Sequence, residues 1–331
     1  MQDAKRICCK KLKLTLLHCR TMSSVTVEVV SRKAILGEGP HWDEVENVLY
    51  FVDIKGKEVR RYDPSSKTET AVKIDEGTIS LVVPVHGQKD KFIISVGRNI
   101  SVLTWDGKSE KPSNLETIAE VDDEEGKREN RLNDGKADPS GRLWAGTMGY
   151  ESGPNMFTQK NGALFSLTKS RTISKHISGI TCSNGLAWTQ DNKTMYYIDS
   201  LTYKVEAYDF DIEKGIPTNR RTAFDFKANS IEGLPDGMTI DSNGKLWVAC
   251  FDGHQVIQVD PENGKLLQRF PLPSPKITSV VFGGPNLDEL YVTSASMDLS
   301  PDELAKYPTA GCTYHIKGIN AKGLPMNRVK M

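Results

Sequence analysis

The chain has 331 residues, of which 26% are charged and 38% hydrophobic, and its formal net charge is zero. This charge balance does not favour nucleic acid or an anionic membrane surface as a partner. No apolar run approaches the roughly 20 residues that cross a bilayer. We therefore expect a soluble protein with no nucleic-acid or membrane partner, long enough for one large domain or two small ones.

The first 21 residues differ from the rest in charge, with six basic residues and one acidic residue. Their apolar stretch is interrupted by Lys13, and no small-residue cleavage site follows, so they do not resemble a secretory signal. We predict a basic, disordered extension over residues 1–21 and one folded domain over residues 22–331. A mitochondrial presequence is the alternative. The absence of any Cys-x-x-Cys pair favours reduced thiols and a cytoplasmic location.

Four short polar motifs recur along the chain at the same phase of a repeating unit. They begin at Glu38 (EGPHWD), Asn133 (NDGKAD), Asn184 (NGLAWTQ) and Asp236 (DGMTID). Each motif starts with an oxygen-bearing side chain, has a glycine one or two residues later, and continues into a short β-like segment that ends in a turn. Measured from turn to turn, the units are 43 to 52 residues long.

The residues between the motifs form short β-branched and aromatic runs bounded by Gly, Asp, Asn or Pro, which is typical of short antiparallel strands. Residues 48–53, 193–199 and 244–249 are examples. Outside the basic extension no sustained 3.6-residue apolar period occurs, which argues against alternating strands and helices. Repeats of about 40 to 50 residues with several strands are typical of propeller blades, so six units predict an all-β, six-bladed β-propeller. Residues 122–130, 150–162 and 294–309 break the pattern and are predicted loops.

The first strand of each propeller blade lines the central channel, so a residue that opens this strand lies at the channel mouth. The motif residues Glu38, Asn133, Asn184 and Asp236 occupy this position, and Leu81 and Ser279 occupy it in the remaining two units. Carboxylate and amide oxygens suit Ca²⁺, Mg²⁺ or Mn²⁺; they do not favour Zn²⁺ but do not exclude it. Three or four such ligands leave coordination positions open, and an open site can polarise a carbonyl and lower the pKa of a bound water.

These residues therefore predict a site for one divalent cation that supports metal-assisted hydrolysis. Asp236 could serve as both a ligand and a proton acceptor, and Arg131 could hold a substrate oxygen. Asn-Gly and Asp-Gly pairs are also strong signals of hairpin turns. One such pair alone would indicate a turn, whereas four in phase before inner strands favour the cation site. The sequence contains neither a Gly-x-Ser-x-Gly elbow nor a phosphate-binding loop, which disfavours those chemistries.

At these motifs the sequence resembles the regucalcin, gluconolactonase and luciferin-regenerating enzyme family. The matching stretches are residues 37–42, 131–139, 146–148, 183–188, 235–237 and 282–286. The resemblance implies a six-bladed propeller in which Glu38, Asn184 and Asp236 bind a divalent cation and Asp236 acts as general base or acid. It also implies that Arg131 and Asn133 contact a sugar-lactone substrate.

The resemblance further implies that Glu151 contacts the substrate, although Tyr150 departs from the acidic pair expected in vertebrate members and the surrounding loop has diverged. The implied protein is a monomeric, cytoplasmic lactonase that uses Ca²⁺, Zn²⁺, Mg²⁺ or Mn²⁺ to open a sugar lactone such as gluconolactone. Two alternatives remain open at this point. One is a calcium-binding regulatory protein, and the other is a specialised hydrolase of the luciferin-regenerating type.

Overall fold

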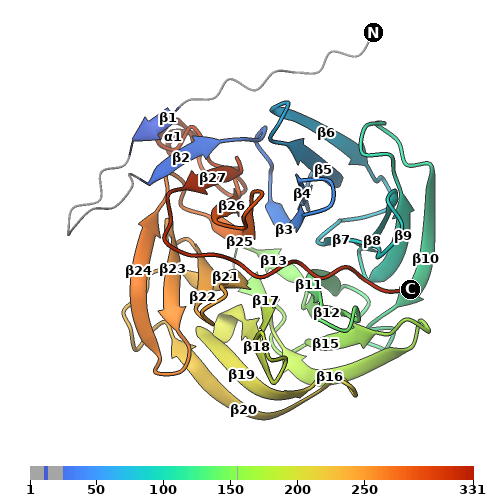
Figure 1. Cartoon of the computed structure of the whole chain (residues 1–331). Coiled ribbons are helices and arrows are strands. Elements are labelled where there is room, and N and C mark those ends of the chain that lie inside the picture. The colour runs from blue at the N-terminus through green and yellow to red at the C-terminus, as the bar shows by residue number, and fades with distance from the viewer. Residues whose placement is uncertain (1–10, 14–24, 155) are drawn as a thin grey trace.

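The computed structural model describes residues 11–13, 25–154 and 156–331. Six antiparallel sheets are arranged around a central channel (Figure 1). The predicted all-β, six-bladed propeller is therefore confirmed. Of the predicted basic extension, only β1 (Lys11–Lys13) lies among the described residues.

Each of the first five blades is a four-stranded sheet whose strands follow one another from the channel outwards. Blade 1 contains β3 (Gly37–Asp43), β4 (Val48–Asp53), β5 (Glu58–Asp63) and β6 (Thr68–Lys73). Blade 2 contains β7 (Val82–Pro84), β8 (Lys91–Val96), β9 (Asn99–Thr104) and β10 (Asn114–Glu120). Blade 3 contains β11 (Arg131–Ala137), β12 (Leu143–Met148), β15 (Gly162–Leu167) and β16 (Ile173–Ile180). Blade 4 contains β17 (Ser183–Trp188), β18 (Thr194–Asp199), β19 (Lys204–Asp211) and β20 (Ile216–Asp225). Blade 5 contains β21 (Leu234–Ile240), β22 (Leu246–Phe251), β23 (Gln255–Asp260) and β24 (Lys265–Pro271).

The sixth blade combines strands from both parts of the chain. Its inner strands are β25 (Ile277–Gly283), β26 (Glu289–Ser294) and β27 (Tyr314–Lys317), and its outer strands are β2 (Thr26–Val29) and β1. β2 pairs antiparallel with β27, with Thr26 opposite Lys317 and Val29 opposite Tyr314. This pairing closes the ring and leaves only short sheet edges, as in other radially repeated β folds.

The four polar motifs lie in the innermost strands β3, β11, β17 and β21, as predicted. At each motif the ladder to the second strand shifts register, between residues 38 and 41, 132 and 134, 184 and 186, and 235 and 238. These shifts are β-bulges, which bend a strand and redirect a side chain. The Asn-Gly and Asp-Gly pairs are therefore bulges inside strands, and their interpretation as hairpin turns is wrong.

The glycines of the motifs allow neighbouring inner strands to approach closely. A Cβ atom on Gly185 would lie 2.8 Å from the carbonyl oxygen of Asp236, and one on Gly237 would lie 2.0 Å from Oγ of Ser279. Any side chain at these positions would push the strands of blades 4, 5 and 6 apart. Gly185 and Gly237 thus bring Asn184 and Asp236 close to the inner strand of the following blade.

The turns that mark the repeat are held by the same contacts in different blades. Asp138 accepts hydrogen bonds from the backbone N of Arg142 (3.0 Å) and from Nε1 of Trp144 (3.0 Å). Asp241 accepts one from Nε1 of Trp247 (2.9 Å) in the equivalent position. Each aspartate closes the turn and ties it to a buried tryptophan, which explains the recurrence of this spacing.

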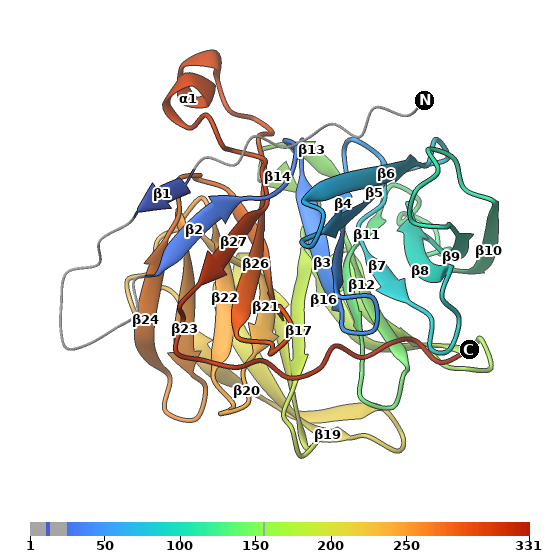
Figure 2. The same ribbon diagram turned by 45° about the horizontal axis from the view of Figure 1, so that its top comes forward.

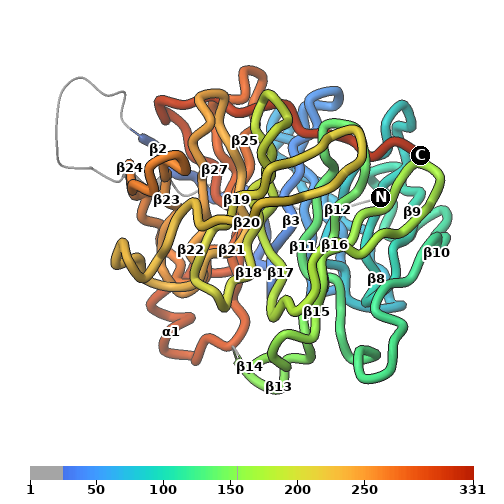
Figure 3. Tube along the Cα trace, turned by 90° about the horizontal axis from the view of Figure 1, so that it is seen from below, coloured from blue at the N-terminus to red at the C-terminus, as the bar shows by residue number. Residues whose placement is uncertain are grey.

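The two ends of the channel are built differently. Two predicted loops contain short elements at one end: β13 (Glu151–Gly153) pairs with β14 (Met156–Phe157), and α1 (Pro301–Lys306) stands out from the ring (Figures 2 and 3). α1 begins at a capping box formed by Ser300 and Glu303. Among the described residues, no helix is long and apolar enough to cross a membrane.

Residues 318–331, here called the C-terminal strap, cross the opposite end of the channel (Figures 1 and 3). The strap contacts five blades. Its backbone hydrogen bonds reach blade 5 (Ser242 N to Lys322 O, 2.7 Å), blade 6 (Gly323 N to Leu287 O, 2.7 Å), blade 2 (Val329 N to Pro84 O, 3.0 Å) and blade 3 (Lys330 N to Gly141 O, 2.9 Å). Its side chains add a hydrogen bond from Asn327 Nδ2 to Ala137 O of blade 3 (3.3 Å) and an ion pair between Arg328 and Asp43 of blade 1. At this end of the channel the strap therefore links blades whose sheets are not hydrogen-bonded to one another.

Candidate cation site at the channel mouth

The channel mouth near β13, β14 and α1 opens into a cavity with an empty volume of about 640 Å³, part of which is open to solvent. The cavity is lined by all six predicted site residues, namely Glu38, Arg131, Asn133, Glu151, Asn184 and Asp236. These residues come from blades 1, 3, 4 and 5 and from β13, so the repeat brings together side chains that are far apart in the sequence.

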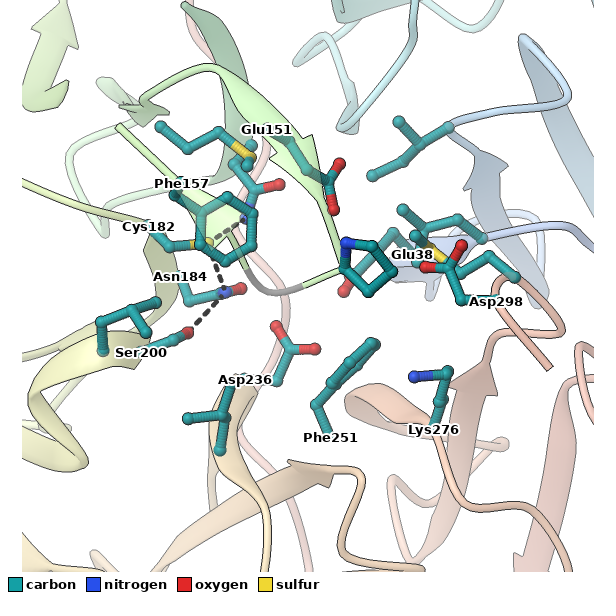
Figure 4. A pocket seen from close by; sticks show the side chains of 18 of the residues that line it. Glu38, Glu151, Phe157, Cys182, Asn184, Ser200, Asp236, Phe251, Lys276 and Asp298 are labelled. Atoms are coloured by element: carbon teal, nitrogen blue, oxygen red, sulfur yellow. Dashed lines mark hydrogen bonds between the residues drawn. The ribbon is translucent and has the colours of Figure 1, made fainter. Parts of the chain in front are cut away.

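The side-chain amide of Asn184 is oriented so that its oxygen has no hydrogen-bond partner. Its Nδ2 donates to Oγ of Ser200 (2.9 Å), and that hydroxyl donates to the carbonyl oxygen of Pro235 (2.7 Å). The Oδ1 atom is buried and unpaired. In Figure 4, the carboxylate of Asp236 lies beside this amide and Ser200 lies on its other side. A buried amide oxygen without a donor carries a desolvation cost that a bound cation would remove.

Asn133, which holds the equivalent position on blade 3, is fully engaged. Its Oδ1 accepts a hydrogen bond from Nη1 of Arg131 (2.7 Å), and its Nδ2 donates to the carbonyl oxygen of Ser183 (2.8 Å). The two asparagines therefore differ although their motifs are alike. The geometry favours Asn184 as a cation ligand and Asn133 as the residue that holds Arg131 in place.

Three buried carboxylates lie close enough to influence one another. Burial, and secondarily the charge of Asp134, raises the pKa of Glu38 to about 8, although the Gly39 N–H and Arg131 oppose this shift. Burial, together with the charges of Glu38 and Asp134, holds the pKa of Asp236 well above its ordinary value. Burial also raises the pKa of Asp134. Carboxylates that repel one another in a desolvated site gain stability when a positive charge lies among them.

The donor set fits a hard divalent cation. Within the part of the chain that the structure describes, no three His, Cys, Asp or Glu side chains form a metal-binding group. The candidate ligands instead combine two carboxylates, Glu38 and Asp236, with the amide oxygen of Asn184. Oxygen-only donors of this kind are those that Ca²⁺, Mg²⁺ and Mn²⁺ prefer.

Arg131 and Glu151 lie on the wall of the cavity formed by blade 3. Both side-chain hydrogen bonds of Arg131 come from Nη1, to Asn133 Oδ1 and to the carbonyl oxygen of Leu132 (3.0 Å). Burial lowers the pKa of Arg131 below its ordinary value, and Cys182 and the nearby carboxylates of Glu151, Glu38 and Asp236 oppose this shift only in part. Glu151 forms an ion pair with Lys55 of blade 1 (3.3 Å), so it links β13 to blade 1 across the top of blade 2.

Sequence reasoning missed four polar residues around the site. Ser200 orients Asn184, and Cys182 lies 3.7 Å from Nδ2 of Asn133. Below the mouth, the half-buried Lys136 of blade 3 donates to the carbonyl oxygen of Met238 on blade 5 (2.8 Å). The fourth residue is Asp134. Asp134 and Lys136 are within the NDGKAD motif, but regular strand alternation would place Asp134 on the face opposite Asn133; the bulge between residues 132 and 134 alters this.

Comparison with known proteins relates this geometry to a family. The family model described as "SMP-30/Gluconolactonase/LRE-like region" matches residues 36–296, which include every candidate site residue. The chain belongs to this family. The SMP-30/gluconolactonase/LRE-like match begins just before Glu38 and ends at Ser296, so it spans all six inner strands.

Individual members of this family match nearly the whole chain in sequence or in structure. Regucalcin of Xenopus laevis is 43% identical over 304 residues, covering 92% of this chain and 98% of the relative. The solved structure of a luciferin-regenerating enzyme is similar with a TM-score of 0.87 and 42% identity, covering 93% of this chain and 100% of the other. A protein of Agrobacterium tumefaciens described as the calcium-binding protein regucalcin is similar with a TM-score of 0.80 and 25% identity, covering 91% and 97%. The family resemblance predicted from the sequence is thus confirmed.

Proposed function

We propose that this protein is a divalent-metal-dependent hydrolase that opens the ring of a sugar lactone, as in a gluconolactonase. The observation that carries the proposal is the unpaired, buried Oδ1 of Asn184 beside Asp236, in the same cavity as Glu38. The family description and the gluconolactonase name within it support a lactone as the substrate. When bound at these three residues, a divalent cation supplies polarisation of the ester carbonyl and a lowered pKa for a water molecule.

The residues of the chain have separate tasks in this reaction. A carboxylate has two oxygens, so Asp236 can hold the cation with one and accept the proton of the attacking water with the other. The same side chain can then return the proton to the leaving ring oxygen. Arg131 is anchored through Nη1, which leaves its Nη2 group to donate to a substrate oxygen, and Glu151 can accept from a substrate hydroxyl. Positioning of this kind lowers the barrier because the donors are already in place.

A metal reconstitution experiment tests the proposal. The full chain is treated with a chelator, and hydrolysis of glucono-δ-lactone is followed by acid release before and after addition of Ca²⁺, Mg²⁺, Mn²⁺ or Zn²⁺. We expect activity to fall to background on chelation and to return with at least one cation. Undiminished turnover in the chelated protein would refute metal dependence, and no turnover with any cation would refute the lactonase assignment.

The hydrogen bond from Asn184 to Ser200 gives a second prediction. The Ser200→Ala substitution removes the acceptor that orients the amide, so we expect cation affinity to fall at least about tenfold, as is usual when a residue that orients a ligand is lost. Calorimetric titration measures this affinity directly. Ser66→Ala, at an exposed position on blade 1, is the matched control and should bind the cation as the unmodified protein does. Equal affinity in both variants would contradict the role of Ser200.

A calcium-binding regulatory role is the second candidate function. It is favoured by the oxygen-only donor set and by the calcium-binding description of the Agrobacterium tumefaciens relative. Micromolar Ca²⁺ binding by calorimetry, together with no lactone turnover under any cation, would favour this function over the hydrolase.

A further inference from the structure

Asp134 and Lys136 lie near the candidate cation site but have no task in the proposed reaction. Neither is among the residues that line the cavity, whereas Glu38 and Asp236 are. A substrate in the cavity therefore does not contact the ammonium group of Lys136. This group can influence the site either through its charge or through the contacts that it makes within the fold.

The strand geometry places Lys136 on the side of the carboxylates that faces away from the mouth. Asp134 and Lys136 are two residues apart on β11, past its bulge, so their side chains point to the same side of the strand. Met238, whose carbonyl oxygen accepts the hydrogen bond from Nζ of Lys136 (2.8 Å), follows Asp236 by two residues on β21. The ammonium group thus extends from the strand of Asp134 to the strand of Asp236, one step further from the mouth than either carboxylate.

The charge of Lys136 is not cancelled by an ion-pair partner of its own. Its hydrogen bond is to a carbonyl oxygen, and within the described residues it forms no ion pair. Burial lowers the pKa of Lys136 to about 8, and the charge of Asp134 opposes this shift, so the amine is mostly protonated at neutral pH. Taking an ammonium group out of water is unfavourable unless negative charge lies nearby. Asp134 supplies this charge and also lies close enough to Glu38 and Asp236 to influence them.

The other basic groups near these carboxylates are engaged elsewhere or uncharged. Arg131 lines the cavity, where it is placed to meet a substrate. Arg328 of the C-terminal strap forms an ion pair with Asp43. Burial, together with the charges of Arg328 and Lys136, lowers the pKa of His41 to about 3, so its imidazole is neutral. Lys136 therefore remains as a positive charge that faces the carboxylates from the side opposite the cavity.

From this arrangement we infer that Lys136 is a built-in counter-ion of the carboxylates and sets the charge of the cation that the site prefers. The inference rests on the cation site of the proposed function and specifies its selectivity. Repulsion between the ammonium group and a bound cation grows with the charge of that cation. For charges about 10 Å apart at an effective dielectric constant of about 20, this repulsion lowers affinity about tenfold for each unit of charge on the cation. Lys136 thereby disfavours a trivalent ion relative to a divalent ion of similar size.

The test measures binding of Ca²⁺ and of Tb³⁺ to the metal-free full chain by calorimetry at pH 7. Both are hard cations of similar radius, so the ratio of their affinities reports on charge. Lys136→Met keeps the length of the side chain and removes its charge. We expect it to raise Ca²⁺ affinity about 100-fold and Tb³⁺ affinity about 1,000-fold. Lys169→Met, at an exposed turn of the same blade, is the matched control and should leave both affinities unchanged.

Asp134→Asn is a second variant with the opposite change of charge. Because it removes a negative charge, we expect Ca²⁺ affinity to fall about 100-fold and the ratio of Tb³⁺ to Ca²⁺ affinity to fall about tenfold. The double variant restores the balance of charge and should bind both ions about as the unmodified protein does. A lysine that only ties blade 3 to blade 5 would not be compensated in this way. Thermal denaturation of the metal-free variants checks that each of them is folded.

The outcomes separate this inference from the proposed function. If Ca²⁺ binds and the ratio of Tb³⁺ to Ca²⁺ affinity is the same in the unmodified protein and in both single variants, the role of Lys136 is overturned and the cation site stands. Binding by Lys136→Met alone would support the inference but overturn the cation site of the unmodified protein. If neither ion binds to any of these proteins, both proposals fail.

Discussion

Replacement of Asp236 by alanine is expected to lower lactone turnover about 10³-fold, because the substitution removes a cation ligand and the proton acceptor together. The fold should be retained. The folded-state pKa of Asp236 is raised above its ordinary value of 3.8 by burial and by the charges of Glu38 and Asp134. In the chelated protein, ionised Asp236 therefore lowers the stability of the folded state increasingly as the pH rises above 3.8. Asp236→Ala in chelator at pH 7 should melt at the same temperature as the unmodified protein or higher.

Two measurements check this prediction: steady-state kinetics with the active cation, and thermal denaturation in the presence of a chelator. Asp302→Ala, which removes an exposed carboxylate on α1, is the control for both. Full turnover in Asp236→Ala would refute the assigned role. A large loss of thermal stability in the chelated variant would show instead that Asp236 supports the fold. The loss of activity would then follow from unfolding and not from loss of the ligand and proton acceptor.

Removal of the C-terminal strap is expected to cost on the order of 5 kcal/mol of folding free energy, a large fraction of the stability of a typical domain. The truncation deletes backbone hydrogen bonds to several blades, the buried side chains of Ile319 and Val329, and the Arg328 partner of Asp43. Loss of Arg328 leaves Asp43, which is 4% exposed, as a buried carboxylate without a cationic partner, held only by the backbone N–H groups of Val45 and Glu46.

Thermal denaturation of the chain truncated after Lys317 measures this effect, and we expect a melting temperature lower by about 10 °C. Arg328→Met should produce a smaller decrease in the same direction. Lys322→Ala is the control because its side chain is exposed and its backbone contacts remain. An unchanged melting temperature in the truncated chain would show that the blades hold together without the strap.

Much of the architecture could be predicted because it depends on local patterns. The four units with a polar motif share the same local pattern. In each of them a polar residue opens the inner strand, and a turn and a second short strand follow. Rotational repetition then requires Glu38, Asn184 and Asp236 to meet at the axis. The convergence of these three side chains could therefore be predicted without knowing any contact between them.

The remaining features depend on contacts between distant segments. The sequence contains no sign that β2 pairs with β27, because this pairing joins residues almost 300 positions apart. It also cannot distinguish Asn133 from Asn184, since the difference arises from Arg131 beside one amide and Ser200 beside the other. Asp134 was missed because a bulge changes the alternation on which strand reasoning relies.

Closure of the ring through β2 and β27 has a consequence for how the protein is made. During synthesis at about 5 to 20 residues per second, blades 1 to 5 can form from contiguous segments as they leave the ribosome. The sixth blade has to wait until residues 314–317 emerge and meet residues 26–29. Until then the nascent chain is an open crescent in which blades 1 and 5 each expose the apolar sheet face that blade 6 later covers. The interval before its last strand is translated is therefore when this polypeptide most needs a chaperone.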